Sequence, residues 1–587
     1  MTDTPDPSTV RPAEPFTFLG LGGTSEVGAS SHLITIGPVR VLVDAGARPS
    51  QTGLAGLPNL DLLDEQPPTT ALLTHAHLDH VGMLPIVTRR FPHLKVYCTP
   101  GTALLTAHVL ADSLNVQAAG GPRAQVFSDV DVRRALNALE VRPFHLPFVT
   151  EADVRVTFYP AGHLPGAAQA LIETGGRKVL HCGDISNVAT SVTEPAWRPD
   201  QPMNDLDAMI LESTYGDTVL PTRRKQVRAL IRAVGQVVRQ GGKVLIPSFA
   251  LGRAQELAVI FAEAIRNQTL PNVPVYLDGM TRAVTQTMED HLELLPGAYR
   301  NAAANGVRQV LTMNLVHMVG QDRADIISRP GPAVVIASGG MLTAGVSPVY
   351  ARAWLPDPKN AMMIVGYQDA ESPGAKLLNL LPGAPLLLPD RRGALTPVTV
   401  RAGVTRYYLS AHADRLGLIA HARACGPKRL VLVHGERRAR ASLAGALNTD
   451  ISTVIPLNGE TSDLNPQALR VPRAFIPQVT DEALRHLHAR GVTEGRVMTV
   501  NGVRTLILPL PGHFRPELIP DGTYQLEVNR AARTHLRIKE LIGRPDEDDE
   551  PGKDLTSADD ADDMDGADDA NDMDDADDAD GAQTQTP

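Results

Sequence analysis

Three imidazoles and one carboxylate lie within six consecutive positions in the segment Thr74-His75-Ala76-His77-Leu78-Asp79-His80. The segment follows a short apolar run that ends at Leu73, which indicates a buried strand. If the chain stays extended, His75 and His77 project to the same side, and Asp79 and His80 can reach a second centre. Nitrogen and oxygen donors without a thiolate fit a catalytic Zn²⁺ or Mn²⁺ better than a closed structural site. The segment therefore predicts a metal site at the end of a strand.

Further His, Asp and Glu residues stand at comparable places along the chain. Each follows an apolar run or lies next to a glycine, which can turn the backbone sharply. These residues are Asp44, His163, Asp184, Glu212, His412 and His434. Taken singly, each has an ordinary explanation, such as a turn carboxylate or a buried histidine. Together they predict a site assembled on loops at one edge of stacked sheets.

The net charge of −11 is distributed unevenly over the 587 residues. Between Asp546 and Asp580 stand 19 acidic residues and one lysine, a local charge of −18, so the rest of the chain carries +7. Ala-Asp-Asp repeats cannot bury enough apolar surface to fold, and we expect a disordered acidic tail at 544–587. This tail could be a solubilising appendage or could contact basic partners. Alternatively, it could compete with nucleic acid for a basic groove and so inhibit the protein itself.

Cysteine usage and hydropathy restrict the compartment. Cys98, Cys182 and Cys425 are far apart and form neither a CxxC pair nor a disulfide framework, which favours a reducing cytoplasm. No apolar run is long enough to span a bilayer, so we expect no membrane partner. The N-terminal residues lack the layout of a signal peptide.

Hydrophobic patterning divides the body of the chain into parts. Short strands and turns up to Glu212 give way, from about Thr222, to helices alternating with strands, which predict an open, mostly parallel sheet. Strands resume after Gly403, and a small α+β appendage is expected beyond Leu457. The individual predictions include helices at 81–90, 282–295 and 481–490, a strand at 406–409, and a hairpin that turns at Asn501-Gly502.

Several motifs, taken in order, resemble a known family. His75 to His80, with Asp44 before it and His163 and Asp184 after it, resembles the metallo-β-lactamase superfamily. Four later motifs look like the β-CASP nucleases: Glu212-Ser213-Thr214-Tyr215-Gly216, the run from Pro247 to Leu257, Ser410-Ala411-His412-Ala413-Asp414 and Val433-His434-Gly435-Glu436.

The resemblance covers roughly residues 16 to 460 and implies an α/β fold. This fold is an αββα metallo-β-lactamase sandwich with an inserted β-CASP domain built on a parallel sheet. The expected boundaries are 1–15 for a flexible N-terminus, 16–215 and 406–460 for the two parts of the sandwich, 216–405 for the β-CASP domain and 461–543 for the appendage.

The resemblance also implies two Zn²⁺ ions, with Mn²⁺ as the alternative. His75, His77 and His163 would hold the first ion, Asp79, His80 and His434 would hold the second, and Asp184 would bridge both. Asp44 would orient a ligand histidine through a hydrogen bond. Asp79, Glu212 and His412 are the expected catalytic residues, with Glu212 positioning His412 beside the scissile phosphate.

Substrate contacts are expected at Arg253, Ser338 and Gly339. Arg253 lies inside a family motif, although it can also pair with Glu256. The loop at Gly339 could let an RNA backbone approach closely, or it is an ordinary turn after a strand. The loops 277–280 and 366–374 depart from the family pattern, so the resemblance does not imply how RNA is gripped or which sequence is preferred.

The function implied is a ribonuclease that cuts RNA internally, in RNA processing or decay. A 5′-to-3′ exoribonuclease of the RNase J type is the nearest alternative, because a further segment follows residue 460. A small-molecule hydrolase of the glyoxalase II or lactamase type is disfavoured by the 250 positions that separate Asp184 from His434. A non-catalytic RNA-binding scaffold is disfavoured because every expected ligand is present. The sequence leaves a homodimer open.

Overall fold

The computed structural model describes residues 14–49, 51, 53–121, 124–390 and 393–466, together with four strands between 496 and 540. The chain divides at Val471 into two units, which are described separately.

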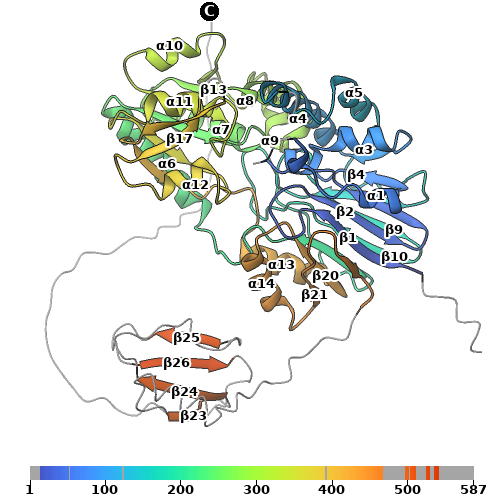
Figure 1. The fold of residues 1–587 in the computed structure, drawn as a ribbon. Helices are drawn as coiled ribbons and strands as arrows, with labels where there is room; N and C mark the ends of the chain where they lie inside the picture. The colour runs from blue at the N-terminus through green and yellow to red at the C-terminus, as the bar shows by residue number, and fades with distance from the viewer. Residues whose placement is uncertain are drawn as a thin grey trace, which may run out of the picture. The chain divides into compact units, whose positions relative to one another are not determined.

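Two seven-stranded mixed sheets form one part of the first unit (Figure 1). In spatial order the strands of one sheet are β22 (Thr461–Asp463), β1 (Phe16–Gly22), β2 (Ser31–Ile36), β3 (Val39–Val43), β4 (Thr70–Leu72), β5 (Val96–Cys98) and β6 (Leu139–Val141). Those of the other are β21 (Ser452–Val454), β20 (Arg429–Val433), β11 (Ala208–Glu212), β10 (Arg177–His181), β9 (Ala168–Thr174), β8 (Arg155–Pro160) and β7 (Phe148–Val149).

Alternating side chains pack these sheets face to face. One core contains Phe16, Phe18 and Ile34 from the first sheet with Val156 and Phe158 from the second, all nearly inaccessible to solvent. Because successive strand residues point to opposite faces, the residues between them are left for the outer faces. The inner core therefore requires a sandwich of two sheets.

Helices cover both outer faces and complete the four layers (Figure 1). On the outside of the first sheet a second core includes Leu42, Val87 and Leu105. On the outside of the other sheet, α13 contacts β11 and α14 contacts β20 and β21. The helices are α1 (Leu62–Glu65), α2 (Leu78–Val81), α3 (Leu84–Arg90), α4 (Pro100–Ala119), α5 (Asp129–Asn137), α13 (Arg415–Cys425) and α14 (Arg437–Leu447).

The segment between β11 and α13 forms a separate parallel sheet with helices on both faces. Its strands, in spatial order, are β14 (Val316–Met318), β13 (Val275–Asp278), β15 (Ala333–Ser338), β12 (Lys243–Ser248), β16 (Ala361–Ile364) and β19 (Gly403–Arg406). The helices are α6 (Arg223–Arg239), α7 (Arg253–Arg266), α8 (Met280–Asp290), α9 (Gly297–Ala304), α10 (Arg323–Ser328), α11 (Ser347–Trp354) and α12 (Pro373–Leu378). A hairpin of β17 (Pro385–Pro389) and β18 (Leu395–Thr399) packs beside them. The αββα sandwich with an inserted parallel-sheet domain is thus confirmed.

Some local predictions were wrong. The strand expected at 406–409 instead covers 403–406, because its partner β16 ends at Ile364, which pairs with Arg406. The helix expected at 81–90 is divided into α2 and α3, since Pro85 occupies the first turn of α3, where a proline is tolerated. The helix expected at 282–295 begins at Met280 and ends at Asp290, before a short 3₁₀ turn at Leu292–Leu294.

The described strands of the second unit form an antiparallel sheet in the order β23 (Arg496–Val500), β24 (Val503–Pro509), β26 (His535–Glu540) and β25 (Tyr524–Val528). The pairing of Val500 with Val503 agrees with the expected hairpin, although its turn residues 501–502 lie outside the described residues. The helix expected at 481–490 also lies outside them.

Across the described part of the chain, no helix combines the length and the apolar character that a membrane crossing requires.

Candidate metal centre

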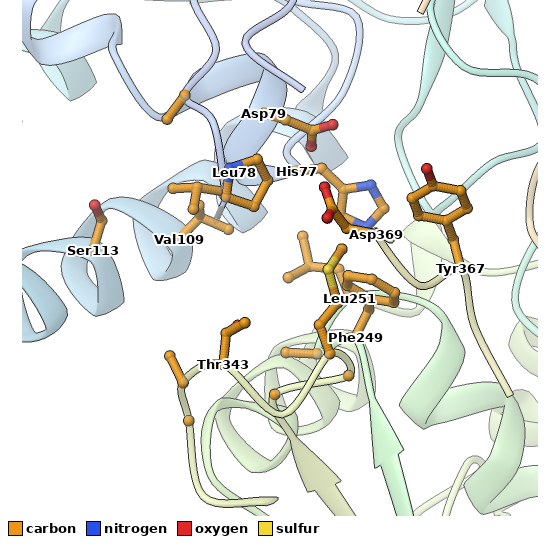
Figure 2. Close-up of a pocket in the computed structure, with 18 of the residues that line it drawn as sticks. His77, Leu78, Asp79, Val109, Ser113, Phe249, Leu251, Thr343, Tyr367 and Asp369 are labelled. Atoms are coloured by element: carbon orange, nitrogen blue, oxygen red, sulfur yellow. The ribbon is translucent and has the colours of Figure 1, made fainter. Parts of the chain in front are cut away.

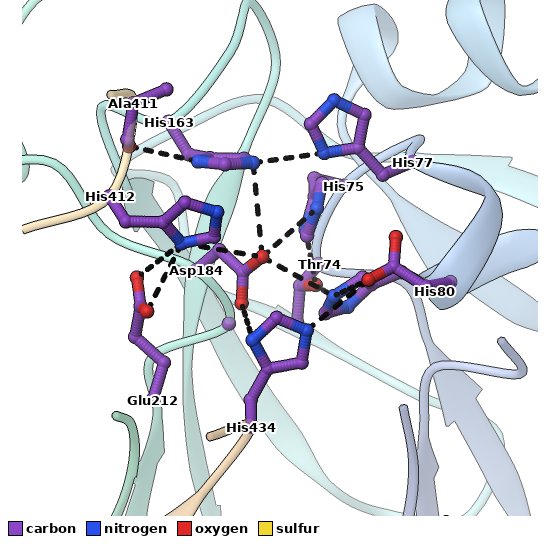
Figure 3. A network of polar contacts seen from close by, with 12 residues as sticks. Thr74, His75, His77, His80, His163, Asp184, Glu212, Ala411, His412 and His434 are labelled. Carbon is purple, nitrogen blue, oxygen red and sulfur yellow. Dashed lines mark hydrogen bonds and ion pairs between the residues drawn. The ribbon is translucent and has the colours of Figure 1, made fainter. Parts of the chain in front are cut away.

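The predicted site residues converge from segments far apart in the sequence onto one edge of the sandwich (Figure 3). Asp44 follows β3, the His75–His80 segment follows β4, and His163 follows β8. Asp184 follows β10, Glu212 ends β11 and His434 follows β20. The buried strands fix where each side chain begins, and the irregular loops after them turn the side chains toward a common centre.

Three imidazoles form a first group of donors. Ligand atoms of His75, His77 and His163 lie within 4.8 Å of one another. His163 Nε2 is 2.9 Å from His77 Nδ1, which is too close for two unrelated lone pairs unless a proton or a cation lies between them. The Nδ1–H of His163 donates a hydrogen bond to the carbonyl oxygen of Ala411 at 2.9 Å. Nε2 is therefore left with a lone pair that can bind a cation.

Asp79, His80 and His434 form a second group, whose ligand atoms also lie within 4.8 Å of one another. His434 Nε2 lies 3.2 Å from Asp79 Oδ2, and His80 Nε2 lies 3.8 Å from the same oxygen. This group contains one carboxylate, whereas the first group contains none.

Asp184 lies between the two groups. Its Oδ2 is 3.6 Å from His75 Nε2, 3.4 Å from His80 Nε2 and 3.8 Å from His163 Nε2, and its Oδ1 is 3.4 Å from His434 Nδ1. A carboxylate whose Oδ2 lies near members of both groups and whose Oδ1 lies near His434 has the placement of a bridging ligand.

Orphaned polar atoms test whether these residues fit a cation. Buried polar atoms nearly always have hydrogen-bond partners. Within the described residues, however, His75 Nε2, His80 Nε2 and Asp184 Oδ1 have none. All three belong to the donor groups above. A donor set of imidazoles and carboxylates with unsatisfied atoms fits divalent cations such as Zn²⁺.

Asp44 holds one of the donors in place. Its Oδ2 lies 2.8 Å from His80 Nδ1, and its two oxygens accept hydrogen bonds from Thr74 N and Thr74 Oγ1, both at 2.7 Å. A proton on His80 Nδ1 leaves Nε2 free to bind a cation. The predicted orienting role of Asp44 has this geometry, and Thr74, which sequence reasoning missed, completes the arrangement.

His412 and Glu212 lie beside the donor groups and form a close pair. His412 Nδ1 is 3.0 and 3.1 Å from the two oxygens of Glu212 and 3.9 Å from Asp184 Oδ2. Glu212 is fully buried and accepts further hydrogen bonds from Ile185 N and Thr214 N. These contacts fix the carboxylate, which in turn orients the imidazole and leaves its Nε2 for another partner.

The protonation states also fit a cation site. Burial lowers the pKa of His75 and His163 well below the usual range, and it lowers the pKa of His77 to about 4. Although burial raises the pKa of Asp184, the imidazoles of His434 and His80 hold it well below its usual range. Neutral imidazoles and an ionised carboxylate are the forms that bind metals.

His412 and His80 differ from the other imidazoles. Burial lowers the pKa of His412, but Glu212 outweighs this effect and raises it to about 9. Burial likewise lowers the pKa of His80, but Asp184 and Asp44 raise it well above the usual range. At His80 a cation can take the place of the proton.

Backbone strain marks two of these positions. Asp44 and His434 have φ angles of 63° and 50°, which non-glycine residues seldom adopt. His434 is held there by hydrogen bonds from its own N–H to Gly23 O at 2.7 Å and from Ser213 N to its carbonyl oxygen at 3.2 Å. Strain of this kind persists where the surrounding structure imposes it, and it is concentrated at functional sites.

A cavity of about 320 Å³ opens beside the donor groups (Figure 2). Its lining includes His77, Asp79, Asp184, His412 and His434. The predicted substrate contacts Arg253, Ser338 and Gly339 also line it. Arg253 pairs with Glu256, as the sequence allowed. The aromatic residues Phe249 and Tyr367 of this lining were not predicted, because an isolated ring after a strand carries no sequence signal.

Two groups of nitrogen and oxygen donors that share a carboxylate, at the edge of an αββα sandwich, define a metallohydrolase. Residues 25–248 match the metallo-beta-lactamase superfamily, residues 254–377 match the Beta-Casp domain, and residues 397–456 match the Zn-dependent metallo-hydrolase RNA specificity domain.

Curated relatives align along most of this chain. An RNase J-like protein of Methanocaldococcus jannaschii is 29% identical over 443 residues, 75% of this chain and 97% of that protein. Transcription termination factor FttA of the same organism is 30% identical over 450 residues, 75% of this chain and 70% of that factor. Endoribonuclease YSH1 of Eremothecium gossypii is 29% identical over 467 residues, 77% of this chain but 59% of that enzyme. The chain belongs to the β-CASP family of the metallo-β-lactamase superfamily.

Proposed function

We propose that this protein is a metal-dependent ribonuclease that hydrolyses phosphodiester bonds within RNA chains, in RNA processing or decay. The observation that carries the proposal is the pair of donor groups joined by Asp184, with His412 and Glu212 beside them at the wall of one cavity. The names of the relatives, an endoribonuclease and an RNase J-like protein, support RNA as the substrate.

The residues suit two divalent ions, for which Zn²⁺ is the first choice and Mn²⁺ the alternative. His75, His77 and His163 would hold one ion, Asp79, His80 and His434 the other, and Asp184 both. Bound here, the ions would neutralise charge on the phosphate and supply a nucleophile at neutral pH.

The remaining steps belong to the chain itself. Glu212 accepts the Nδ1–H of His412 and thereby points Nε2 away from the carboxylate. From there Nε2 can bind a phosphate oxygen or give a proton to the leaving sugar oxygen. The deep position of the donors, with His75 fully buried and His163 4% exposed, keeps bulk water away from these charges.

The test is cleavage of an RNA whose 5′ end is blocked and whose body is labelled, compared with single-stranded DNA and a thioester. Internal fragments from the blocked RNA are expected with metal-loaded protein. Hydrolysis of the thioester alone, with intact RNA, would refute the proposal.

One observation favours the exonucleolytic alternative of RNase J type: this chain aligns with 97% of the length of the RNase J-like relative. It predicts that a 5′ block stops degradation and that an open 5′ end yields mononucleotides. End analysis of the products therefore decides between the two activities.

We further propose a cytoplasmic location, because the three cysteines are isolated and buried. We also propose that the protein can form a homodimer. Sedimentation of the full chain, which gives the mass of the particle in solution, tests this.

A further inference from the structure

The catalytic cavity has two chemically different walls (Figure 2). His77 and Asp79 stand on one side with the donor groups, whereas Phe249 and Leu251 stand on the other. Met280 and Met341 also line the cavity. A ligand in this cavity therefore meets His77 and Asp79 on one flank and the apolar side chains of Phe249 and Leu251 on the other.

Cationic side chains contribute little to this lining. Among the described lining residues the guanidinium groups are those of Arg48 and Arg253. Arg48 forms an ion pair with Glu26 at 2.8 Å, and Arg253 forms one with Glu256. Nucleic-acid binding usually depends on Lys and Arg at the phosphates, so the apolar wall must contribute through the other recognisable part of RNA, the bases.

Phe249 occupies a special place in the inserted sheet. It directly follows β12, and the neighbouring parallel strands on either side, β15 and β16, are followed by Gly340 and Gly366. Ligands of open parallel sheets bind outside the carboxyl ends of the strands. The ring therefore stands where this sheet type binds ligands.

The two glycines form a seat for the ring. A Cβ atom added to Gly366 would lie 3.0 Å from Phe249 Cε2, and one added to Gly340 would lie 3.2 Å from its Cδ2. Such contacts are tighter than ordinary van der Waals contact, so a larger residue at either position would require the ring to shift by a few tenths of an ångström. Phe249 is thereby fixed, and its ring centroid lies 6.2 Å from that of His77.

We propose that Phe249 is the stacking platform for the nucleobase next to the scissile phosphate, so that cleavage requires a base at that position. The proposal rests on the ribonuclease function proposed above. Every base has a π-face, so stacking on an aromatic ring tolerates any sequence. The charged wall then takes the phosphate, and the apolar wall takes the base.

The experiment is a scan of RNA substrates in which one nucleotide at a time lacks its base. For the wild-type protein we expect kcat/KM to fall about tenfold or more when the abasic position adjoins the cleaved bond, and to change little when it lies far away. In a second scan, 2-aminopurine replaces the base at the same position. Its fluorescence should be quenched when the RNA binds to metal-stripped protein, a measurement that requires no turnover.

The variants separate stacking from general packing. Phe249→Leu should raise KM about tenfold on intact RNA, abolish the penalty for the abasic site and remove the quenching. Phe249→Tyr should retain the KM, the abasic penalty and the quenching of the wild-type protein. Phe91→Leu, the same change at a partly buried ring outside the cavity lining, serves as the matched control and should behave like wild type.

The outcomes distinguish this inference from the proposed function. If wild-type protein cleaves no RNA, the proposed function fails. If it cleaves intact and abasic RNA equally well, or if Tyr367→Leu and not Phe249→Leu abolishes the discrimination, the function stands and the platform at Phe249 is refuted. Should Phe249→Leu fail to fold, Tyr367→Leu still decides, because loss of the discrimination in this variant would refute the platform at Phe249 and its retention would support it.

Discussion

Asp44→Asn tests how the metal centre is organised, because this substitution changes the contacts of one oxygen, which faces His80 Nδ1 and Thr74 Oγ1, and little else. Asparagine tolerates the left-handed backbone of this position, where φ is 63°. Its amide oxygen can still accept the hydrogen bond from Thr74 N. Its NH₂ group, however, replaces the oxygen that lies 2.8 Å from His80 Nδ1, and two N–H groups would then face each other.

The imidazole of His80 can avoid this conflict by moving its proton to Nε2, the atom that faces Asp184 at 3.4 Å. A protonated Nε2 cannot bind a cation. Loss of such an orienting partner weakens metal binding by about 10- to 100-fold, which corresponds to about 1.4 to 2.7 kcal/mol. The metal-free protein loses a hydrogen bond to a charged group, worth about 1.5 to 3 kcal/mol.

The assay compares metal content and affinity, by elemental analysis and calorimetric titration, with the free energy of unfolding of the metal-free protein. Asp207→Asn is the matched control, because Asp207 is also buried and accepts hydrogen bonds from Lys178 N and Lys428 Nζ at 3.0 and 2.9 Å. It precedes β11 at the end opposite Glu212, so it should cost stability but no metal affinity. Equal metal affinity in wild type and Asp44→Asn would refute the orienting role.

Four further predictions follow from the same structure. His412→Ala should keep both metals yet lose about 100-fold or more in kcat, whereas Asp184→Ala should lose metal and activity together; metal loss in His412→Ala would show that His412 is a ligand. Removing the metals with a chelator should lower the Tm, and Zn²⁺ should restore it; an unchanged Tm would contradict a preformed site. Burial, with Arg198 nearby, lowers the pKa of His421 to about 3, so between pH 3 and 6.5 the unfolded chain binds a proton that the folded chain does not. The free energy of unfolding should therefore fall as pH drops from about 6.5 towards 3, by up to about 1.4 kcal/mol per pH unit. In urea titrations, the free energy of unfolding of His421→Gln should depend less steeply on pH over this range. Deleting 546–580 should leave ribonuclease activity unchanged or raise it, and a large loss would contradict both the inert and the self-inhibiting tail.

The sequence was sufficient for the elements that carry the site. Apolar runs such as Val39–Val43 and Arg429–Val433 end abruptly in a polar residue, and each is a buried strand in the structure. In contrast, the sequence patterns predicted no helix or strand for residues 96–141. Its long helix α4 has apolar residues on most sides and two threonines, Thr102 and Thr106, fully buried. Periodicity cannot identify a helix that is apolar around its whole circumference.

Element boundaries failed where tertiary pairing decides them. Tyr407 and Leu409 are as buried as strand residues, so the pattern extends past Arg406, but the neighbouring strand ends first. For the candidate site, the sequence motifs and the family resemblance pointed to the titratable residues that converge in the structure. They could not identify Thr74, the carbonyl group of Ala411 or the ring of Phe249, because hydroxyls, carbonyls and phenyl rings occur everywhere and only the fold brings these three to the site.

The candidate site lowers the stability of the folded protein, which explains why rigid, fully buried strands hold it. Unpaired polar atoms at His75, His80 and Asp184 are each expected to destabilise a buried region by about 1 to 3 kcal/mol, and the strained backbone of Asp44 and His434 adds about 1 to 3 kcal/mol at each residue. A chain that folds in spite of this must gain the stability elsewhere, and the sandwich core supplies it through side chains such as Phe18 and Phe158 that are completely buried. The loops that bear the donors are short continuations of these same strands. Rigid strands therefore hold a centre that is unfavourable without a cation, and a bound cation would satisfy the polar atoms that the fold leaves unpaired.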